Sequence, residues 1–151
     1  TATAWLRSIS TRASSSGRGT SRPRRRTGQH GSRAFPVASY LAYVFEKMTV
    51  PAMLHEGAGK LDQRHALREG DAVLAISFAP YSEETLSLAA DARARGLAVV
   101  ALTDTLSSPL ARAADAVLTV QEVDFGAFRS LSATIAMAIT LAVAVGTARK
   151  A

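Results

Sequence analysis

The chain has 151 residues, of which 48% are hydrophobic and 20% charged, and this composition is typical of one globular domain. It contains no cysteine, which excludes disulfide bonds, thiolate metal ligands and a cysteine nucleophile and agrees with a cytoplasmic location. The longest apolar stretch, residues 133–146, is shorter than the ~20 residues that cross a bilayer, so we expect no membrane span.

The net charge of +6 is concentrated at the start of the chain. Residues 1–45 hold eight arginines and no acid, whereas residues 46–151 hold ten basic and twelve acidic residues. Residues 1–32 are too polar to offset the entropy lost on ordering, so we expect a separate, basic, low-complexity segment that is disordered. Its RPRRR cluster supports at most nonspecific binding to nucleic acid or anionic lipid, because no aromatic residue accompanies it to stack on bases.

From Ala34 onward, helical and strand patterns alternate. A helical stripe covers 34–48, and a short apolar segment follows at 50–56, where Pro51 restricts a strand to the edge of a sheet. A Gly-rich loop and a polar helix are expected over 57–70. The continuous apolar run at 71–77 is typical of parallel strands buried on both faces, and the segment at 97–104 predicts a second buried strand. The segment at 116–120 predicts a third strand.

Three further helices are expected at 82–96, 107–115 and 127–146. Ser82 and Ser108 precede two of them as N-caps, and Pro109 suits a first helical position. The alternation predicts a doubly wound α/β domain with a parallel sheet. In such domains ligands bind at the carboxyl ends of the strands, near helix N-termini.

The segment ISFAPYSEET, residues 76–85, falls at such a position. Ser77 ends a strand and Ser82 begins a helix, so the loop offers two hydroxyls and backbone N–H groups at the positive end of a helix dipole. Sites of this kind bind anions, most often phosphate, without a metal. The simpler interpretation is that Ser82 only caps the helix and Ser77 only ends the strand. The loop has no lysine and no glycine-rich nucleotide motif, which excludes a P-loop.

Residues 70–120 resemble the second half of a SIS (sugar isomerase) domain. The resemblance is carried by the segment ISFAPYSEE, then Gly96, Thr103-Asp104, Ser108-Pro109-Leu110-Ala111 and Ala114-Asp115. The form I-S-F-x-P-Y-S, together with RAFPVASYLAY and FRSLSA, is similar to SIS domains of RpiR/MurR-type bacterial transcriptional regulators. The resemblance covers about residues 33–148.

This resemblance implies a three-layer α-β-α sandwich with a parallel, flavodoxin-like sheet and a site for a phosphorylated sugar effector. The ligand-binding residues that it implies are Ser32, Arg33, Ser77, Ala79, Tyr81, Ser82 and Glu84. It implies no catalytic residue, metal or cofactor. In that family DNA is bound by a helix-turn-helix domain, which this sequence does not contain. The nearly uncharged helix at 127–146 suits the interface of a homodimer or higher homo-oligomer.

Three features depart from the SIS pattern. Ala79 replaces its second serine and Pro80 replaces its glycine, so one hydroxyl is lost. A SIS domain also opens with a hydrophobic central strand, and no such strand is evident before Arg33, so we expect it to be missing or replaced. Residues 1–32 are interpreted as a disordered basic arm, a segment resembling a transit peptide, or an out-of-frame reading of a GC-rich gene.

Several functions remain open. The first is a non-catalytic sensor that binds a sugar phosphate, with Tyr81 closing over the sugar or packing on a partner subunit. The second is an aldose–ketose sugar-phosphate isomerase, which needs an acid and a base; His55, Glu56 and Glu84 are the candidates. The alternatives are a surface loop for His55 and an acid that complements the helix dipole for Glu84. The third is a basic nucleic-acid-binding arm on an inert fold. Ala79 and Pro80 favour the sensor.

Overall fold

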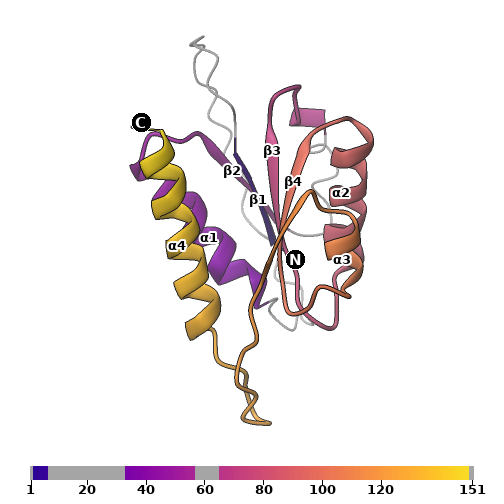
Figure 1. Ribbon diagram of the computed structural model, residues 1–151, viewed down its shortest axis with the longest axis vertical. Helices are drawn as coiled ribbons and strands as arrows, with labels where there is room; N and C mark the ends of the chain where they lie inside the picture. Colours follow the sequence, from indigo (N-terminus) through magenta and orange to yellow (C-terminus); the bar gives the residue numbers. More distant parts are fainter. Residues whose placement is uncertain (1, 7–32, 57–64, 150–151) are drawn as a thin grey trace, which may run out of the picture.

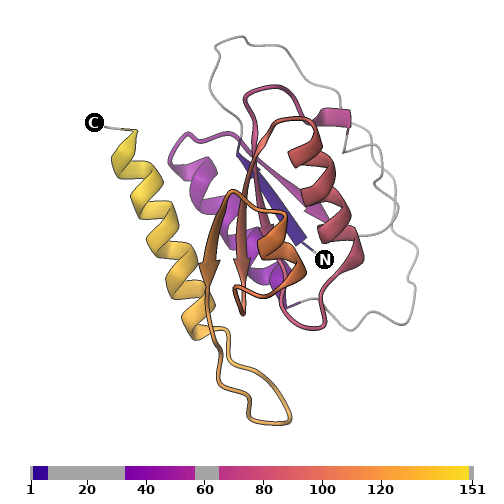
Figure 2. The same ribbon diagram turned by 45° about the vertical axis from the view of Figure 1, so that its right-hand side comes forward.

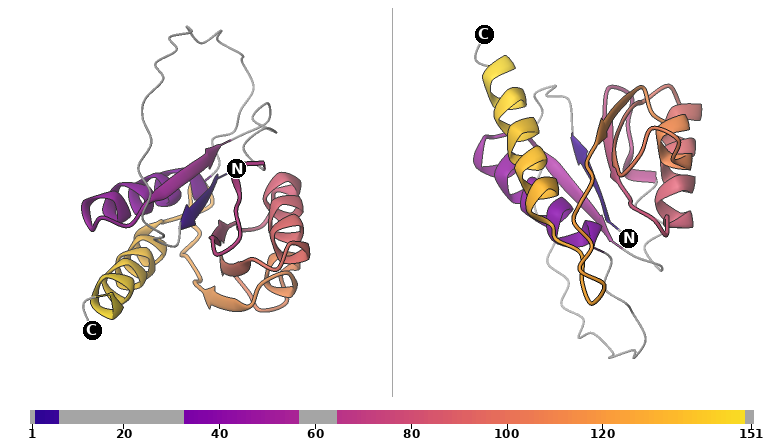
Figure 3. Two further views of the ribbon diagram at one scale, coloured as in Figure 1. Left: turned by 90° about the horizontal axis from the view of Figure 1, so that it is seen from above. Right: turned by 60° about the horizontal axis from the view of Figure 1, so that its bottom comes forward.

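The computed structural model describes residues 2–6, 33–56 and 65–149. Its elements are β1 (Ala2–Leu6), α1 (Ala34–Lys47), β2 (Ala52–Glu56), β3 (Ala72–Ile76), α2 (Glu83–Ala94), β4 (Ala98–Thr103), α3 (Pro109–Arg112), β5 (Ala116–Thr119) and α4 (Ser132–Ala148). One five-stranded sheet has the order β2-β1-β3-β4-β5. Helices α1 and α4 cover one face of the sheet and α2 and α3 cover the other (Figures 1 and 3). The predicted three-layer sandwich with flavodoxin-like strand order is confirmed.

The sheet is parallel except at β1, the second strand in its order. β3 pairs in parallel with β4, and β4 with β5. β1 runs antiparallel to both β2 and β3, so β2 has the same direction as β3, β4 and β5. The position between β2 and β3 is therefore filled by a strand of reversed direction.

Strand β1 was not expected from the sequence, which predicted no strand before Arg33. The segment ATAWL is short, and nothing in its local pattern distinguishes it from a loop. Its reason to be extended is non-local: without it, facing backbone N–H and C=O groups of β2 and β3 would lack partners. The rest of the expected basic segment, residues 7–32, lies outside the described residues.

Two apolar clusters fill the spaces between the layers. Alternate residues of β3 point to opposite faces: Leu74 and Ile76 belong to the cluster under α1 and α4, and Val73 and Ala75 to the cluster under α2 and α3. Phe45 of α1 is among the largest fully buried side chains. Burial on both faces explains why β3 and β4 read as continuous apolar runs.

Most element boundaries agree with the predicted ones, with two exceptions. The last helix begins at Ser132 rather than at 127, because the residues before it turn at Gly126, which has φ +78°, and pair Asp124 with Arg129 in an isolated β-bridge. The polar helix expected over 57–70 is absent from residues 65–70, where only a short 3₁₀ turn forms at 65–66, and residues 57–64 lie outside the described chain.

Candidate functional site

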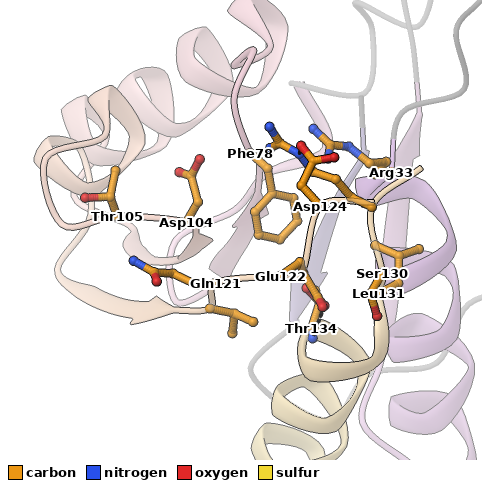
Figure 4. Close-up of a pocket in the computed structure, with 12 residues that line it drawn as sticks. Arg33, Phe78, Asp104, Thr105, Gln121, Glu122, Asp124, Ser130, Leu131 and Thr134 are labelled. Atoms are coloured by element: carbon orange, nitrogen blue, oxygen red, sulfur yellow. Dashed lines mark hydrogen bonds and ion pairs between the residues drawn. The ribbon is translucent and has the colours of Figure 1, made fainter. Parts of the chain in front are cut away.

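Because β3, β4 and β5 are parallel, the residues that follow them meet at one edge of the sheet. A pocket of about 360 Å³ lies at this edge (Figure 4). Its described lining comes from the ends of all three strands, from the start of α1 and from the loop before α4. The lining residues are Arg33, Phe78, Asp104, Thr105, Val120, Gln121, Glu122, Asp124, Arg129, Ser130, Leu131 and Thr134.

The two serines of the 76–85 segment are linked to each other. The Oγ atom of Ser77, which is buried, accepts a hydrogen bond of 3.1 Å from the backbone N–H of Ser82. The Oγ atom of Ser82 accepts a bond of 3.4 Å from the N–H of Thr85, and this contact confirms Ser82 as the N-cap of α2. Each hydroxyl keeps its own proton to donate and a further lone pair. Their roles in ligand binding remain predictions.

Asp104, which follows β4, anchors the turn between these serines. Its carboxylate accepts hydrogen bonds from Tyr81 Oη at 2.7 Å, from the backbone N–H of Ala79 at 3.2 Å and from Thr103 Oγ1 at 3.2 Å. Burial opposes ionisation of Asp104, but the bonds from Tyr81, Ala79 and Thr103 outweigh it and lower the pKa of this carboxyl. The same bond raises the pKa of the Tyr81 phenol. The Ala79 amide of the expected anion loop is thus bound to the chain's own carboxylate.

Two arginines bring positive charge to the pocket. Arg33, at the N-cap position of α1, donates from Nη2 to the carbonyl oxygen of Ala79 at 2.7 Å. Because a guanidinium has five N–H donors, this single bond leaves others for a ligand. Arg129 donates from Nε to Asp124 at 2.6 Å. A hydrogen bond from the Gly126 N–H and the contact with Arg129 lower the pKa of Asp124, and Arg33 lies near it across the pocket (Figure 4).

The side chain of Glu122, which follows β5, reaches the N-terminus of α4. Its Oε1 accepts a hydrogen bond of 2.6 Å from the backbone N–H of Thr134. Burial opposes ionisation, but hydrogen bonds at this helix start outweigh it, so the pKa of Glu122 is lowered. The carboxylate of Glu122, a residue of the chain itself, therefore already binds a backbone N–H in the first turn of α4.

The structure also brings together two of the three residues considered for isomerase chemistry. His55 lies at the end of β2 with only 2% of its side chain exposed, and its Nε2 is 3.3 Å from Oε1 of Glu84 in the first turn of α2. His55 is therefore not a surface histidine. Neither residue is among the described residues that line the pocket. The side chain of Glu56 lies outside the described part of the structure.

The seven residues implied as ligand contacts have different positions. Arg33 lines the pocket, whereas Ser77, Ala79, Tyr81 and Ser82 form the adjacent turn. Glu84 faces His55, and Ser32 lies outside the described residues.

Of the twelve lining residues, sequence reasoning named only Arg33 as a site candidate, and the eleven that it missed include Phe78, Asp104, Glu122 and Arg129. A signal existed for two of them, since Asp104 and Glu122 follow apolar strands of a predicted parallel sheet.

Fold and site together define a doubly wound α/β domain with a polar pocket at the carboxyl edge of its sheet. The SIS domain family model matches residues 30–145, so the chain belongs to the SIS domain family. A search of curated proteins found no match.

The solved structures that are similar to the chain include those of two bacterial proteins. One is the sugar isomerase domain of an RpiR transcription factor from Sphaerobacter thermophilus, with 31% identity, a TM-score of 0.67 and coverage of 76% of this chain and 64% of that one. The other is the NanR protein of Vibrio vulnificus complexed with ManNAc-6P, with 24% identity, a TM-score of 0.64 and coverage of 72% and 43%. The chain thus corresponds to less than two thirds of either relative.

The described residues contain no group of three or more His, Asp or Glu side chains arranged to hold a metal ion. Among the same residues, no helix has both the length and the apolar character needed to span a membrane.

Proposed function

We propose that this chain is the effector-sensing domain of an RpiR-type transcriptional regulator and that it binds a phosphorylated sugar without converting it. The observation that carries the proposal is the pocket at the carboxyl edge of the sheet, where Arg33 is bonded to the serine-flanked turn 77–82. The similarity to the SIS domain of an RpiR transcription factor supports it.

The chemistry of the pocket suits both halves of such a ligand. A sugar phosphate is an anion, and it is favoured by Arg33 in the lining and by the start of α2 beside the adjacent turn. The other arginine of the lining, Arg129, is paired with the carboxylate of Asp124. Sugar hydroxyls need hydrogen-bond partners, which the side chains of Gln121, Thr105 and Ser130 supply from the pocket lining.

We also propose that the domain forms a homodimer through α4. None of the 17 residues of this helix is charged. Its exposed face includes Ile139, 42% exposed, and Val143, 60% exposed, which lie one turn apart. Transfer of such a face from water into a helix pair is favourable. In the proposed regulator, a helix-turn-helix domain outside this chain would bind DNA.

An isomerase is the second candidate, and the contact between His55 and Glu84 favours it. A buried imidazole at 3.3 Å from a carboxylate resembles a pair that transfers protons. Turnover of aldose and ketose phosphates by the purified chain distinguishes the two candidates. We expect none. Turnover that disappears in both Glu84→Gln and His55→Ala would overturn the sensor proposal.

The direct test is thermal unfolding of the full chain with a panel of sugar phosphates. Stabilisation follows RT ln(1 + [L]/Kd), so a ligand at 100 times its Kd adds about 2.7 kcal/mol. We expect a rise in Tm with at least one sugar phosphate, none with the matching unphosphorylated sugar, and a smaller rise in Arg33→Gln. No shift with any member of the panel, on a folded sample, contradicts the proposal.

A further inference from the structure

The loop between β5 and α4 carries an exposed cluster of large apolar side chains. Val123, Phe125 and Phe128 are 60%, 61% and 64% exposed, and the two phenylalanine rings stack with centroids 5.1 Å apart. We name these three residues the aromatic tip. The loop projects beyond the rest of the described chain at the end of the molecule where α4 begins (Figures 1 and 2).

The aromatic tip is held in a defined conformation. The backbone N–H of Phe125 donates to the carbonyl of Phe128 at 2.9 Å, and that of Ser130 donates to the carbonyl of Val123 at 3.0 Å. The ion pair between Asp124 and Arg129 closes the base of the turn. A protruding, internally bonded turn with exposed aromatic side chains has the features of a binding anchor, because little conformational entropy is lost when it docks.

A hollow of about 670 Å³ lies at the opposite end of α4. Its described lining residues are Lys47, Met48, Thr49, Val143, Gly146, Thr147 and Arg149. Arg149 ties the two helices of this region together, since its Nη1 donates to the carbonyls of Met48 at 3.3 Å and Thr49 at 3.0 Å. At Gly146 an added Cβ would be only 2.8 Å from Met48 Sδ, so the absence of a side chain there lets the helices approach closely.

The aromatic tip and the hollow cannot meet within one chain. The 17 residues of α4 separate them, which corresponds to about 25 Å of helix. They can meet between two copies if their α4 helices pack antiparallel about a two-fold axis, because the start of one helix then lies beside the end of the other.

The chemistry of the two surfaces is complementary. Among its described lining residues the hollow has two cations, Lys47 and Arg149, and no carboxylate. The loop that bears the tip has Glu122 and Asp124 against Arg129, so its net charge is negative. Phenylalanine rings attract both cations and the sulfur atom of methionine, and Met48 lies in the hollow.

We propose that the aromatic tip of one copy of this chain docks in the hollow of a second copy, so that two such contacts flank an antiparallel α4 pair. This inference rests on the α4 dimer proposed above. Since the tip belongs to the loop that lines the ligand pocket, docking connects each pocket to the partner subunit. The contact would thus transmit occupancy of the pocket across the dimer.

Disulfide trapping tests the inference. Because the native chain has no cysteine, any disulfide must form between the introduced cysteines. Phe128→Cys and Thr147→Cys chains are mixed and oxidised, and Ile139→Cys is oxidised alone as the probe of α4 pairing. We expect a covalent dimer in the mixture and in Ile139→Cys, but none in Phe128→Cys alone. If Ile139→Cys forms a covalent dimer but the mixture of Phe128→Cys and Thr147→Cys does not, the tip contact is overturned. The α4 dimer is then still supported. Trapping of Phe128→Cys alone shows a parallel pair and also overturns it.

A second measurement needs no crosslink. We expect Phe125→Ser with Phe128→Ser to weaken dimerisation at least tenfold in sedimentation, with the far-ultraviolet dichroism of the folded chain retained. The control is Leu106→Ser, which replaces another exposed apolar side chain on a different loop and should leave the dimer constant unchanged. Equal dimer constants for the double variant and the native chain contradict the inference.

Discussion

Tyr81 donates its phenolic hydrogen to Asp104 across 2.7 Å, and this bond joins the turn after β3 to the residue after β4. The turn is bonded on both sides, because Arg33 donates to the carbonyl of Ala79 while Asp104 accepts from the N–H of the same residue. In a SIS pattern the positions of Ala79 and Pro80 hold serine and glycine. Here contacts with Asp104 and Arg33 determine the shape of the loop.

The first prediction concerns the bond between Tyr81 and Asp104. Tyr81→Phe removes the donor and keeps the ring, so we expect the free energy of unfolding to fall by about 1 kcal/mol. Urea denaturation measures this change. Tyr43→Phe, on an exposed part of α1, is the matched control and should leave the midpoint unchanged. A Tyr81→Phe midpoint equal to the native one would show that the bond contributes nothing.

The second prediction is a pH dependence due to Asp104. Its pKa in the folded chain lies below the ordinary value of 3.8, so the native state favours the ionised carboxyl. The resulting stability is present above that ordinary value and is lost as the pH falls through the folded pKa. We expect the native chain to lose more stability than Asp104→Asn between neutral pH and about pH 3. Urea midpoints across this range test it, and parallel curves for the two proteins contradict it.

Predictions that rest on local pattern agree with the structure. Ser82 and Ser108 cap their helices, and the strands at β3 and β4 are buried on both faces. Helix caps and the spacing of apolar residues depend on neighbours in the sequence, so they can be predicted from the sequence of one chain. Strand β1 depends on two partners far along the chain, β2 and β3, and its own five residues do not reveal it.

The edge of the sheet at which the pocket lies was predicted, but the contacts between residues at this edge were not. The rule for parallel strands located the pocket near Ser77, yet the contacts of Asp104 with Tyr81 and of His55 with Glu84 join residues more than 20 positions apart. Such pairs are set by how the strands, helices and loops pack together in the folded chain. No spacing in the sequence encodes them, so the roles of Asp104 and Glu122 had to come from the structure.

The third prediction tests Glu122 as a cap of α4. Glu122→Ala leaves the N–H of Thr134 without this acceptor, so we expect a loss of about 1 kcal/mol in unfolding free energy. Glu122→Gln keeps an acceptor but loses the charge that interacts with the helix dipole, so its loss should be smaller. Chemical denaturation of both variants measures the order. A larger loss in Glu122→Gln than in Glu122→Ala would rule out the capping role.

The last prediction concerns the contribution of β1 to the stability of the sheet. Because β1 lies between β2 and β3, proline at its centre removes a backbone donor and forces its ring into a paired ladder. We expect Ala4→Pro to lower the urea midpoint clearly, by the loss of a bond worth about 1 kcal/mol and by the added steric clash. The control is Glu83→Pro, which places the same ring at the first position of α2, where no helical N–H bond is needed. If the urea midpoint of Ala4→Pro equals that of the native chain, residues 2–6 do not stabilise the sheet. In that case β2 and β3 must be held together without them.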